Sequence, residues 1–474
     1  MLKKDRKVII IGAGPAGISA GYMLSKHTHV EIFEASPYIG GMSRSLDLWE
    51  QRVDLGPHRF FSKDQDINHF FHEVLGNEYT QVSRLTRIYY KNRFFDYPLK
   101  IFNVLSNLRI TTVATILIDY VKQRLSPIKN PDTFEKWVTN RFGKKLYTIF
   151  FKHYSEKLWG ISCDRIDAEW AAQRIKNLSL FEAVWSALKG NAGNKHKTLV
   201  DEFSYPKNGT GSLYEKAANC IEENGGKIYK NYPITKVLIE DNNCKGVMTG
   251  DGKVHYADTI ISSMPITLLL KGIEGVPDYV IQASNQLYFR NTILVYLEVD
   301  DDQLFKDNWI YVHSPDVTHG RITNFRNWCP SLTKGKNTSI LCMEFWAFDK
   351  ETIWTASDKE LSELASKELR ILKLVPEDKK ILNSKIIRVP KCYPVYEIGY
   401  KQYLQPITDY LKKMENLIPI GRYGTFKYNN QDHSILMGII AARKILGTSD
   451  ADLWEINTDT EYQEDGKVKD VLRG

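Results

Sequence analysis

The amino-acid sequence predicts an α/β fold with a helical insertion and a second, mixed β-sheet, and three observations predict it. A short β-branched run, Val8–Ile11, is followed at once by a glycine-rich turn, as expected of a parallel strand covered on both faces. Residues 101–190 carry apolar residues at helical spacing. Residues 286–347 contain several runs rich in Tyr, Trp, Ile and Val, which are typical of strands.

The turn after the first strand has the spacing of a Rossmann-like dinucleotide-binding loop. Its first glycine makes the turn, its second lets backbone N–H groups approach a pyrophosphate, and its third lets the next helix pack closely on the strand. The proline suits the first helical position. An acid ends the following strand, where a carboxylate accepts hydrogen bonds from an adenosine ribose and disfavours a 2′-phosphate. The cofactor-binding residues predicted here are Gly12, Gly14, Pro15, Ala16, Gly17 and Glu34.

Two further glycine-containing segments follow the acidic strand. The first is a glycine pair beside an arginine, which suits a chain that passes one pyrophosphate twice around a buried FAD, although glycine pairs also make ordinary turns. The second places small, rigid residues before an imidazole, and a lone histidine is more often structural than catalytic. At this point NAD and FAD both stay open. The candidates are Gly40, Gly41, Ser43, Arg44, Gly56, Pro57 and His58.

Length and composition limit the class of protein. A chain of 474 residues exceeds what one core usually serves and indicates two or three domains. Hydrophobic residues make up 43% and charged residues 26%, as in soluble globular proteins, and the net charge of +7 is dispersed, which argues against nucleic-acid binding. Six scattered cysteines predict no metal site and a cytoplasmic location. No run is apolar for long enough to span a bilayer.

Changes in pattern along the chain predict four regions. Polar and glycine-rich residues 188–197 are expected to form an exposed loop at the end of the helical insertion. The predicted dinucleotide-binding domain is discontinuous and comprises residues 1–86, 196–275 and 412–447. The helical domain comprises residues 101–195, the substrate-binding sheet domain residues 87–100 and 276–411, and a C-terminal extension residues 448–474.

Another glycine-rich and polar segment precedes the last predicted helix, residues 435–446. Asp432 or Ser434 is expected to cap this helix, whose N-terminal end would stabilise negative charge on a ligand. A well-capped C-terminal helix alone would also explain the stretch. The cofactor-binding candidates are Gly421, Arg422, Asn430, Gln431 and Ser434, together with Val237 from the predicted strand 234–240.

Taken together, these segments resemble the FAD-dependent UDP-galactopyranose mutases, especially the longer eukaryotic-type members. More distantly they resemble the protoporphyrinogen oxidase, phytoene desaturase and amine oxidase flavoproteins. All of these share the glycine loop and the glycine pair, which therefore imply only the cofactor, FAD. The last motif looks like the mutase flavin-binding signature, slightly shortened. The more specific motifs are residues 54–58, 133–137, 159–161, 205–211, 421–424 and 430–434.

The resemblance also implies a substrate site. In those mutases two arginines and two tyrosines grip the substrate diphosphate, and guanidinium groups suit phosphate oxygens. The matching residues here are Arg174, Arg321, Tyr393 and Tyr428. Trp159, Trp309 and Tyr311 match aromatic positions near the sugar and Tyr97 a position near the uracil, although taken alone these aromatics are better explained as core residues.

Two departures from the family pattern leave the base and the hexose open. Where the mutases have Tyr-Pro-Phe-Gln, this chain has Leu99 and Lys100 after Tyr97 and Pro98. Ser155 stands where the mutases have an asparagine near the sugar. The expected diphosphate grip matches the family better than either of these positions.

The resemblance implies an isomerase that interconverts the pyranose and furanose forms of a UDP-galactose-like sugar for polysaccharide biosynthesis. Reduced FAD would form an adduct with the sugar through N5, so no protein nucleophile is needed. The implied catalytic residues are His58, at the flavin edge, and Arg174 and Arg321, which hold the departing diphosphate. An external reductant such as NAD(P)H and a homo-oligomer are both compatible with this reading.

Two alternatives stay open. A FAD-dependent oxidoreductase of the protoporphyrinogen oxidase, amine oxidase or desaturase kind would share the fold, but it needs a hydride path and usually a largely apolar cavity. A catalytically silent dinucleotide-binding protein would hold FAD without turnover. Arginines that line the cavity would favour the mutase over the oxidoreductase.

Overall fold

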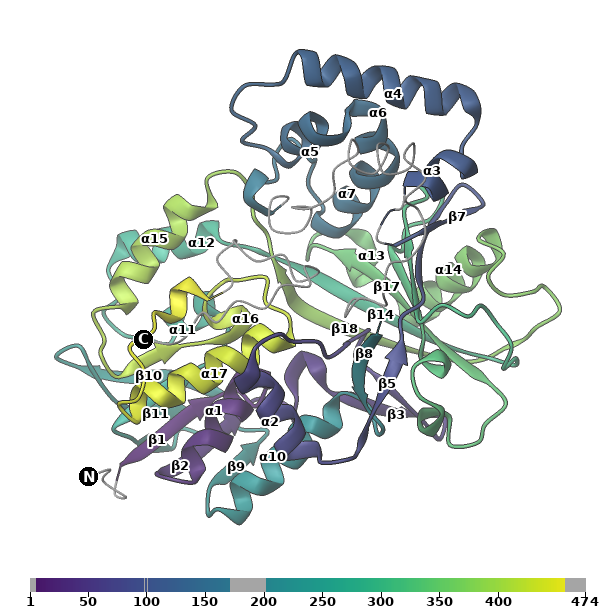
Figure 1. The fold of residues 1–474 in the computed structure, drawn as a ribbon. Coiled ribbons are helices and arrows are strands. Elements are labelled where there is room, and N and C mark those ends of the chain that lie inside the picture. The colour runs from purple at the N-terminus through teal and green to yellow at the C-terminus, as the bar shows by residue number, and fades with distance from the viewer. Residues whose placement is uncertain (1–5, 98, 100, 171–201, 457–474) are drawn as a thin grey trace.

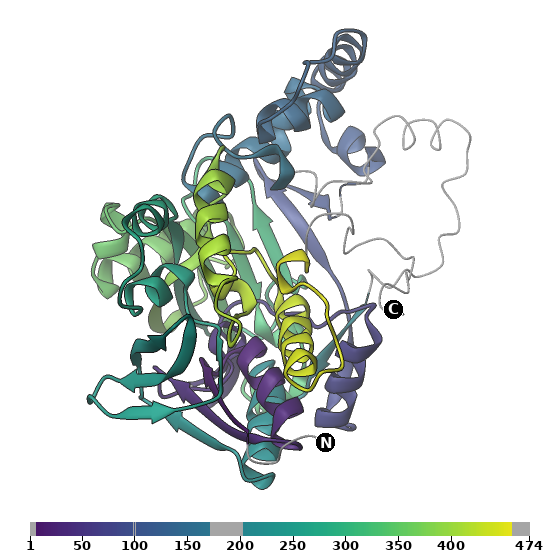
Figure 2. The same ribbon diagram turned by 90° about the vertical axis from the view of Figure 1, so that its left-hand side faces the viewer.

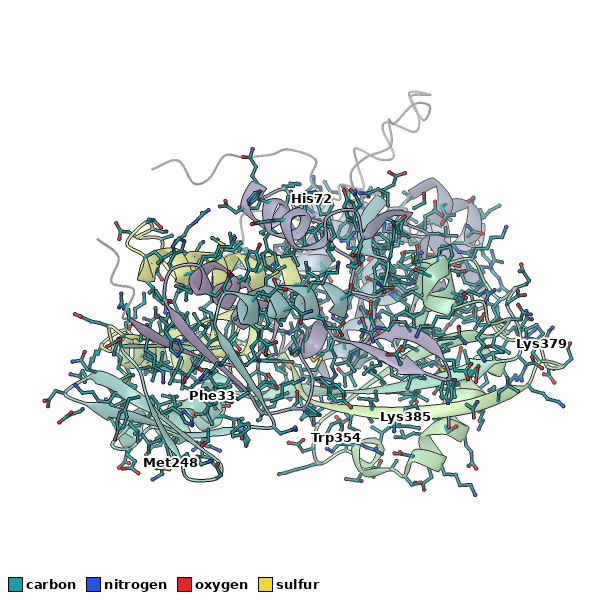
Figure 3. The ribbon with its side chains drawn as sticks, turned by 90° about the horizontal axis from the view of Figure 1, so that it is seen from below. Phe33, His72, Met248, Trp354, Lys379 and Lys385 are labelled. Carbon is teal, nitrogen blue, oxygen red and sulfur yellow. The ribbon has the colours of Figure 1, made fainter. Side chains whose placement is uncertain are left out.

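The fold is built around two sheets that lie side by side. A computed structural model describes residues 6–97, 99, 101–170 and 202–456. Figure 1 shows the first sheet with β1, β2 and β9 at the lower left, and the view from below places Phe33 on this sheet and Lys385 on the other (Figure 3). The first sheet is parallel, in the order β19-β13-β1-β2-β9. Its strands are β1 Lys7–Ile11, β2 His29–Glu34, β9 Lys227–Lys230, β13 Thr259–Ser262 and β19 Leu417–Pro419.

Helices from distant parts of the sequence pack around this parallel sheet. The last helix, α17, packs along the first, α1, so closely that a Cβ on Gly438 would lie 2.3 Å from the carbonyl oxygen of Ala16. A three-stranded antiparallel sheet contacts β13. The helices are α1 Pro15–Ser25, α2 Gln65–Leu75, α10 Gly211–Glu223, α11 Ile266–Lys271, α12 Asp278–Gln286, α15 Tyr400–Leu411, α16 Gly421–Gly424 and α17 Gln431–Ile445, and the small sheet is β10 Ile234–Glu240, β11 Asn243–Thr249 and β12 Val254–Tyr256.

The second sheet has seven strands in the order β18-β14-β17-β16-β15-β6-β7. It is mixed, because β15 pairs with β6 in parallel while the other neighbours are antiparallel. Every residue of its central strands β14 and β17 is buried, and helix α14 packs on one face. The elements are β6 Thr86–Tyr90, β7 Arg93–Asp96, β14 Phe289–Val299, β15 Trp309–Val312, β16 Arg321–Asn324, β17 Ser339–Ala347, β18 Ile381–Pro394, α13 Thr352–Thr355 and α14 Asp358–Ile371.

Short strands and single turns of 3-10 helix complete the part of the fold around these sheets. Two antiparallel pairs, β3 with β4 and β5 with β8, connect segments that lead into the parallel sheet. Their bounds are β3 Ser45–Leu48, β4 Gln51–Asp54, β5 Tyr79–Ser83 and β8 Glu202–Pro206, and the 3-10 turns are η1 Gly41–Ser43, η3 Phe325–Asn327, η4 Pro330–Thr333 and η5 Leu453–Glu455.

A helical region lies at the top of Figures 1 and 2 and contacts the second sheet, through α3 with β7 and α7 with β17. Within the helical spacing predicted from residue 101 onward, the structure divides the described residues into short helices. An extended Arg109 separates α3 from α4, and Gly143, at a φ of +82°, separates α5 from α6. The elements are α3 Ile101–Asn107, α4 Ile110–Leu125, α5 Phe134–Phe142, α6 Lys144–Tyr147, the π-helical turn η2 Thr148–Lys152 and α7 His153–Trp159.

The structure confirms the predicted α/β fold with its mixed second sheet. The predicted cap of the last helix is wrong: α17 begins at Gln431, and Asn430, in an extended conformation, is its N-cap residue. Asp432 therefore lies in the first turn. The domain boundaries remain predictions, and the expected loop at residues 188–197 falls outside the described residues. None of the described helices is long and apolar enough to cross a membrane.

Candidate functional site

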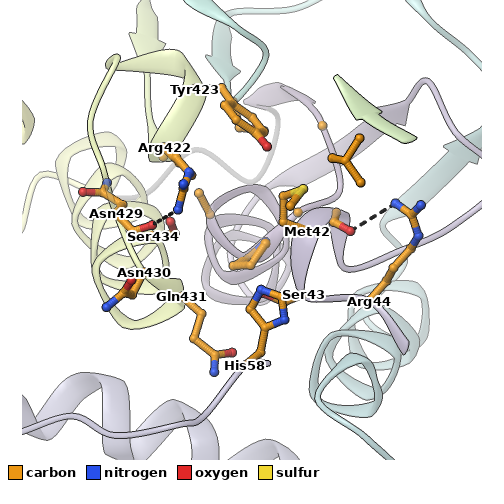
Figure 4. Close-up of a pocket in the computed structure, with 18 of the residues that line it drawn as sticks. Met42, Ser43, Arg44, His58, Arg422, Tyr423, Asn429, Asn430, Gln431 and Ser434 are labelled. Atoms are coloured by element: carbon orange, nitrogen blue, oxygen red, sulfur yellow. Dashed lines mark hydrogen bonds between the residues drawn. The ribbon is translucent and has the colours of Figure 1, made fainter. Parts of the chain in front are cut away.

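A cavity of about 690 Å³ lies between the carboxyl ends of the parallel strands and the seven-stranded sheet. This is where open α/β sheets place their ligands, and the volume is that of a typical ligand site. Figure 4 shows part of its wall. Many residues singled out in the sequence line it: Gly12, Gly14, Pro15, Ala16, Glu34, Gly41, Ser43, Arg44, Pro57, His58, Tyr97, Trp309, Tyr311, Arg321, Tyr393, Gly421, Arg422, Tyr428, Asn430, Gln431 and Ser434.

Other candidates are placed elsewhere. Gly17, Gly40 and Gly56 lie next to the wall in sequence without lining it. Val237 is buried in β10 of the small sheet, and Trp159 is buried in the core behind the cavity, with its ring 5.9 Å from that of Tyr428. Arg174 falls outside the described residues.

One side of the cavity, here called the glycine wall, is formed by Gly12, Gly14, Gly41 and Glu34. Gly12 has a φ of +97°, which a residue with a side chain rarely adopts. The two glycine loops touch, because a Cβ on Gly41 would lie 3.0 Å from the Cα of Gly14. The backbone of both loops therefore faces the cavity directly, as the approach of a pyrophosphate requires.

Glu34 is held in place at the end of β2. One carboxylate oxygen accepts a hydrogen bond from the N–H of Ala13 at 2.8 Å, and the other accepts one from the N–H of Ser36 at 2.9 Å. A carboxylate has about four acceptor positions, so both oxygens retain capacity for the hydroxyl groups of a ligand.

A buried carboxylate that the sequence analysis did not select supports the segment leading to His58. Asp54 accepts hydrogen bonds from the hydroxyl of Ser45 at 2.5 Å, the hydroxyl of Tyr205 at 2.6 Å and the N–H of Thr210 at 3.0 Å. Its own carbonyl accepts one from Tyr296 of the second sheet at 2.8 Å. Burial raises the pKa of Asp54. Asp54 thus links β8 and the start of α10 to the second sheet just before the His58 turn.

His58 lines the cavity as a neutral imidazole. Burial, followed by the positive charges of Arg321 and Arg422, lowers the pKa of His58 to about 4. Its Nδ1 lies 3.1 Å from the carbonyl oxygen of Gly56. Because a carbonyl oxygen only accepts hydrogen bonds, Nδ1 must carry the proton. Nε2 is then the acceptor that His58 offers to a ligand.

Arg321 reaches the cavity from β16 already paired with a carboxylate. It lies opposite Glu344 of β17, and its Nε and Nη2 donate to the two carboxylate oxygens, the second at 2.5 Å. Burial alone would lower the pKa of Arg321, but the charge of Glu344 and the neighbouring tyrosines raise it. The sequence analysis missed this partner, which leaves Nη1 as the guanidinium nitrogen for a ligand.

Two more arginines line the cavity, and each has a buried nitrogen atom without a hydrogen-bond partner among the described residues. Arg422 donates to the carbonyls of Cys392 and Asn429, at 2.9 and 3.0 Å, while its Nη2 is buried with no hydrogen-bond partner among the described residues. Arg44 donates to Gly41 at 3.3 Å, and its Nε is likewise without a partner in the described chain (Figure 4). Buried donors of this kind are costly unless a ligand satisfies them.

The opposite side of the cavity, here called the aromatic wall, is made of side chains from the second sheet and nearby loops. The Arg422 guanidinium lies 4.6 Å from the ring of Tyr393 and 4.5 Å from that of Tyr428. Farther along, the Tyr97 and Tyr311 rings are 4.8 Å apart. The sequence analysis did not select several other lining residues. The aromatic wall consists of Tyr97, Trp309, Tyr311, Trp328, Tyr393 and Tyr428 with Arg321, and the further unselected residues include Arg59, Arg84, Ser263 and Tyr423.

The sequence profile of the flavin-containing amine oxidoreductases matches residues 15–446. The chain belongs to this family. The wider flavoprotein group predicted from the motifs is therefore confirmed.

Individual relatives of this flavin-containing family are distant. A probable UDP-galactopyranose mutase of Klebsiella pneumoniae is 25% identical over 175 residues, which are 35% of this chain and 44% of that protein. A 4,4′-diapophytoene desaturase of a Methylomonas species is 23% identical over 288 residues, 55% of this chain and 54% of that protein. The matches therefore span about half or less of these relatives. The crystal structure of a reduced UDP-galactopyranose mutase shares the fold, with a TM-score of 0.84 and 22% identity over 96% of this chain and 98% of that one.

The cavity residues fit the flavin dinucleotide that family membership implies. The glycine wall leaves space for a pyrophosphate beside the N-terminus of α1. The unpartnered nitrogens of Arg44 and Arg422 call for acceptor atoms on a ligand, and α17 begins at the cavity. Among the described residues no group of His, Cys, Asp and Glu could hold a metal ion.

Proposed function

We propose that this flavoprotein is a mutase that interconverts the pyranose and furanose forms of a UDP-galactose-like nucleotide sugar. One observation carries the proposal: the cavity that begins at the glycine wall ends at a guanidinium, Arg321, surrounded by aromatic side chains. A cationic, hydroxyl-bearing lobe suits a diphosphate, whereas amines, porphyrinogens and polyenes call for a largely apolar lobe. The similarity in fold to the reduced mutase agrees with this choice.

The protein's own part in the reaction is to position charge. FAD, when bound and reduced, supplies the nucleophilic atom for the sugar, so no protein nucleophile is needed. Arg321 holds the diphosphate through Nη1 while Glu344 fixes the plane of its guanidinium. Tyr393 and Tyr428 add neutral hydroxyl donors. The bond to the diphosphate breaks with a gain of negative charge on the leaving group, which Arg321 stabilises.

His58 and the start of α17 act on the flavin side. A neutral His58 with its acceptor at Nε2 takes a hydrogen bond from the cofactor without adding positive charge. The N-terminal end of α17 favours negative charge in the cavity, as on a reduced flavin. Arg174 remains a second candidate for the diphosphate, on the basis of the sequence alone. Cytoplasmic location, a homo-oligomer and an NAD(P)H reductant also remain predictions.

The decisive experiment compares reduced with oxidised holoenzyme. The purified flavoprotein is reduced with dithionite and incubated with UDP-galactopyranose and with UDP-N-acetyl-sugars, and the products are separated by anion-exchange chromatography and identified by NMR. A furanose isomer formed only by the reduced protein supports the mutase. Oxygen-dependent turnover of an amine or a polyene with no isomer would overturn the proposal in favour of the oxidoreductase, and flavin binding without turnover of either kind would favour a silent binding protein.

A further inference from the structure

The outer face of helix α4 carries a stripe of exposed apolar side chains far from the cavity. Ile110 is 86% exposed and Leu125 81%, although both are large and apolar. Six of the sixteen large hydrophobic side chains exposed in the described part of the chain fall within residues 110–128. The apolar stripe, as it is called below, consists of Ile110, Leu117, Ile118, Val121 and Leu125, followed by Ile128 after the helix.

Helical geometry puts these residues on one side. They recur at i, i+7, i+8, i+11 and i+15 from Ile110, which at 3.6 residues per turn gives a single band along α4. The opposite side of the helix is the one that faces the protein. Ile116 is buried there, and the carboxylate of Asp119 accepts a hydrogen bond from the N–H of Lys145 at 2.6 Å. The helix therefore has apolar residues on both its inner and outer faces.

Cations border the apolar stripe. Lys122 and Arg124 lie on its two flanks within α4, Arg109 precedes the helix, and Lys129 follows it. Asp119 is the single acid between Arg109 and Lys129, and it is turned inward. A helix with an apolar face flanked by lysine and arginine is the pattern of a segment that lies in the interface of an anionic membrane.

The dimensions of the apolar stripe favour a membrane over a second protein as its binding partner. In both views α4 forms the upper limit of the helical region (Figures 1 and 2). Sixteen residues make a ridge about 24 Å long and roughly 10 Å wide, so the stripe offers on the order of 250 Å², well below the roughly 800 Å² per partner of a stable protein interface. A lipid surface accepts a narrow convex ridge without needing a complementary groove.

We infer that α4 is a docking surface for an anionic lipid bilayer, with the apolar stripe inserted among the headgroups and the flanking cations against the lipid phosphates. The inference does not depend on the proposed catalytic function. It assigns to the helical region a role separate from the cavity, namely holding the enzyme at a membrane surface.

The test uses the holoenzyme and sedimentation with large unilamellar vesicles of phosphatidylcholine, with or without one third phosphatidylglycerol. The wild type should sediment with the anionic vesicles at low salt, less at high salt, and little with neutral vesicles. Two variants divide the contributions: Ile118→Gln/Val121→Gln/Leu125→Gln removes the stripe, and Lys122→Gln/Arg124→Gln/Lys129→Gln removes the charge. Each variant should lower the partition coefficient between anionic vesicles and buffer at least about tenfold. For the charge variant this follows because one near-surface cation contributes about a fivefold increase in binding.

A matched control removes exposed apolar side chains elsewhere: Tyr256→Gln/Leu382→Gln should bind vesicles like the wild type. Flavin content verifies that every variant folds. Absence of wild-type binding to anionic vesicles, or equal binding by the wild type and both α4 variants, would overturn the inference. So would a wild-type dimer that the stripe variant splits into monomers without any vesicle binding, because the stripe would then be the contact between two copies.

Discussion

The glycine wall and the aromatic wall of the cavity are built by different means. The glycine wall is mostly backbone, and its residues are small because a loop must touch another loop or a ligand, as where Gly41 meets Gly14. The aromatic wall is made of large side chains from β15, β16, β18 and nearby loops, held by one another and by the ion pair of Arg321 with Glu344. The glycine wall requires residues with little or no side chain, whereas the aromatic wall requires large side chains. Substitutions should therefore separate cofactor retention from substrate binding.

The largest effect is expected from Gly12→Ala in the glycine wall. The alanine Cβ would lie 2.3 Å from the hydroxyl oxygen of Ser263 at a φ of +97°, so either this hydroxyl gives up its hydrogen bond to the Ile11 carbonyl or the strained glycine loop moves. Purified protein should contain less than about a tenth of the wild-type flavin, a loss of roughly 1.4 kcal/mol or more in binding. The matched control is Gly225→Ala, with a φ of +89° and open space around the Cβ. Flavin loss in both variants would mean that backbone strain alone is responsible.

The next effect concerns the buried ion pair of the aromatic wall. Arg321→Met leaves the Glu344 carboxylate buried without its partner, which should lower the free energy of unfolding by about 3–5 kcal/mol and abolish UDP binding measured by calorimetry. Arg87→Met is the control, because Arg87 makes the same two-point contact with buried Asp307 outside the cavity. It should lose stability but bind UDP normally. Unchanged UDP affinity in Arg321→Met would contradict the assignment of the diphosphate to the aromatic wall.

Adding Glu344→Met to Arg321→Met sharpens the same test. The double variant no longer buries an unpaired charge, so most of the lost stability should return while UDP binding stays absent. Thermal unfolding and calorimetry on the same preparation measure the two properties. Recovery of UDP binding in the double variant would show that Arg321 acts only through the fold.

A smaller effect, on the pH dependence of stability, is expected from replacing His58 in the cavity. Its pKa is lowered from the ordinary 6.5 to about 4 in the folded protein, so the unfolded chain binds more protons between these values. Stability is therefore complete above about pH 6.5 and is lost as the pH falls, by about 2 kcal/mol at pH 5. His58→Gln should lack this loss in urea unfolding compared at pH 7 and pH 5. The exposed His27→Gln is the control, and equal pH dependence of wild type and His58→Gln would contradict the neutral buried imidazole.

The smallest expected effect is the removal of one hydroxyl from the aromatic wall. Tyr393→Phe should weaken UDP binding about five- to tenfold, since one hydrogen bond contributes about 1 kcal/mol, and should leave flavin content unchanged. Tyr288→Phe removes a half-buried hydroxyl that donates to Glu397 away from the cavity, and it should change neither property. If Tyr393→Phe instead releases flavin, the two walls are not independent.

The difference between the walls also explains what the sequence could predict. Gly12, Gly14 and Glu34 are close in sequence, and the backbone geometry of a strand, a turn and a helix dictates their residue types. They could be selected as cavity residues before any fold was known. Family membership and the α/β fold follow from the same local pattern.

The remaining features depend on contacts that the sequence does not encode locally. Glu344 meets Arg321 only through the register of β16 and β17. Asp54 gains partners from two distant segments, residues 205–210 and Tyr296. Trp159 could not be assigned to the core or the cavity from its type, and the structure places it behind the wall. The sequence did not predict that α17 begins at Gln431, because Asn430, Asp432 and Ser434 are all residue types that favour the N-cap position.

The contact of α17 with α1 has a consequence for folding during synthesis of the protein. The ribosome makes the loop at Gly12 long before β19, which pairs with β13 in the parallel sheet, and α17, which lines the cavity. The parallel sheet therefore stays unfinished until the residues after 417 have been made. We therefore expect the coenzyme to bind only after α17 has been made, so that nascent chains stalled before α17 should leave the ribosome colourless.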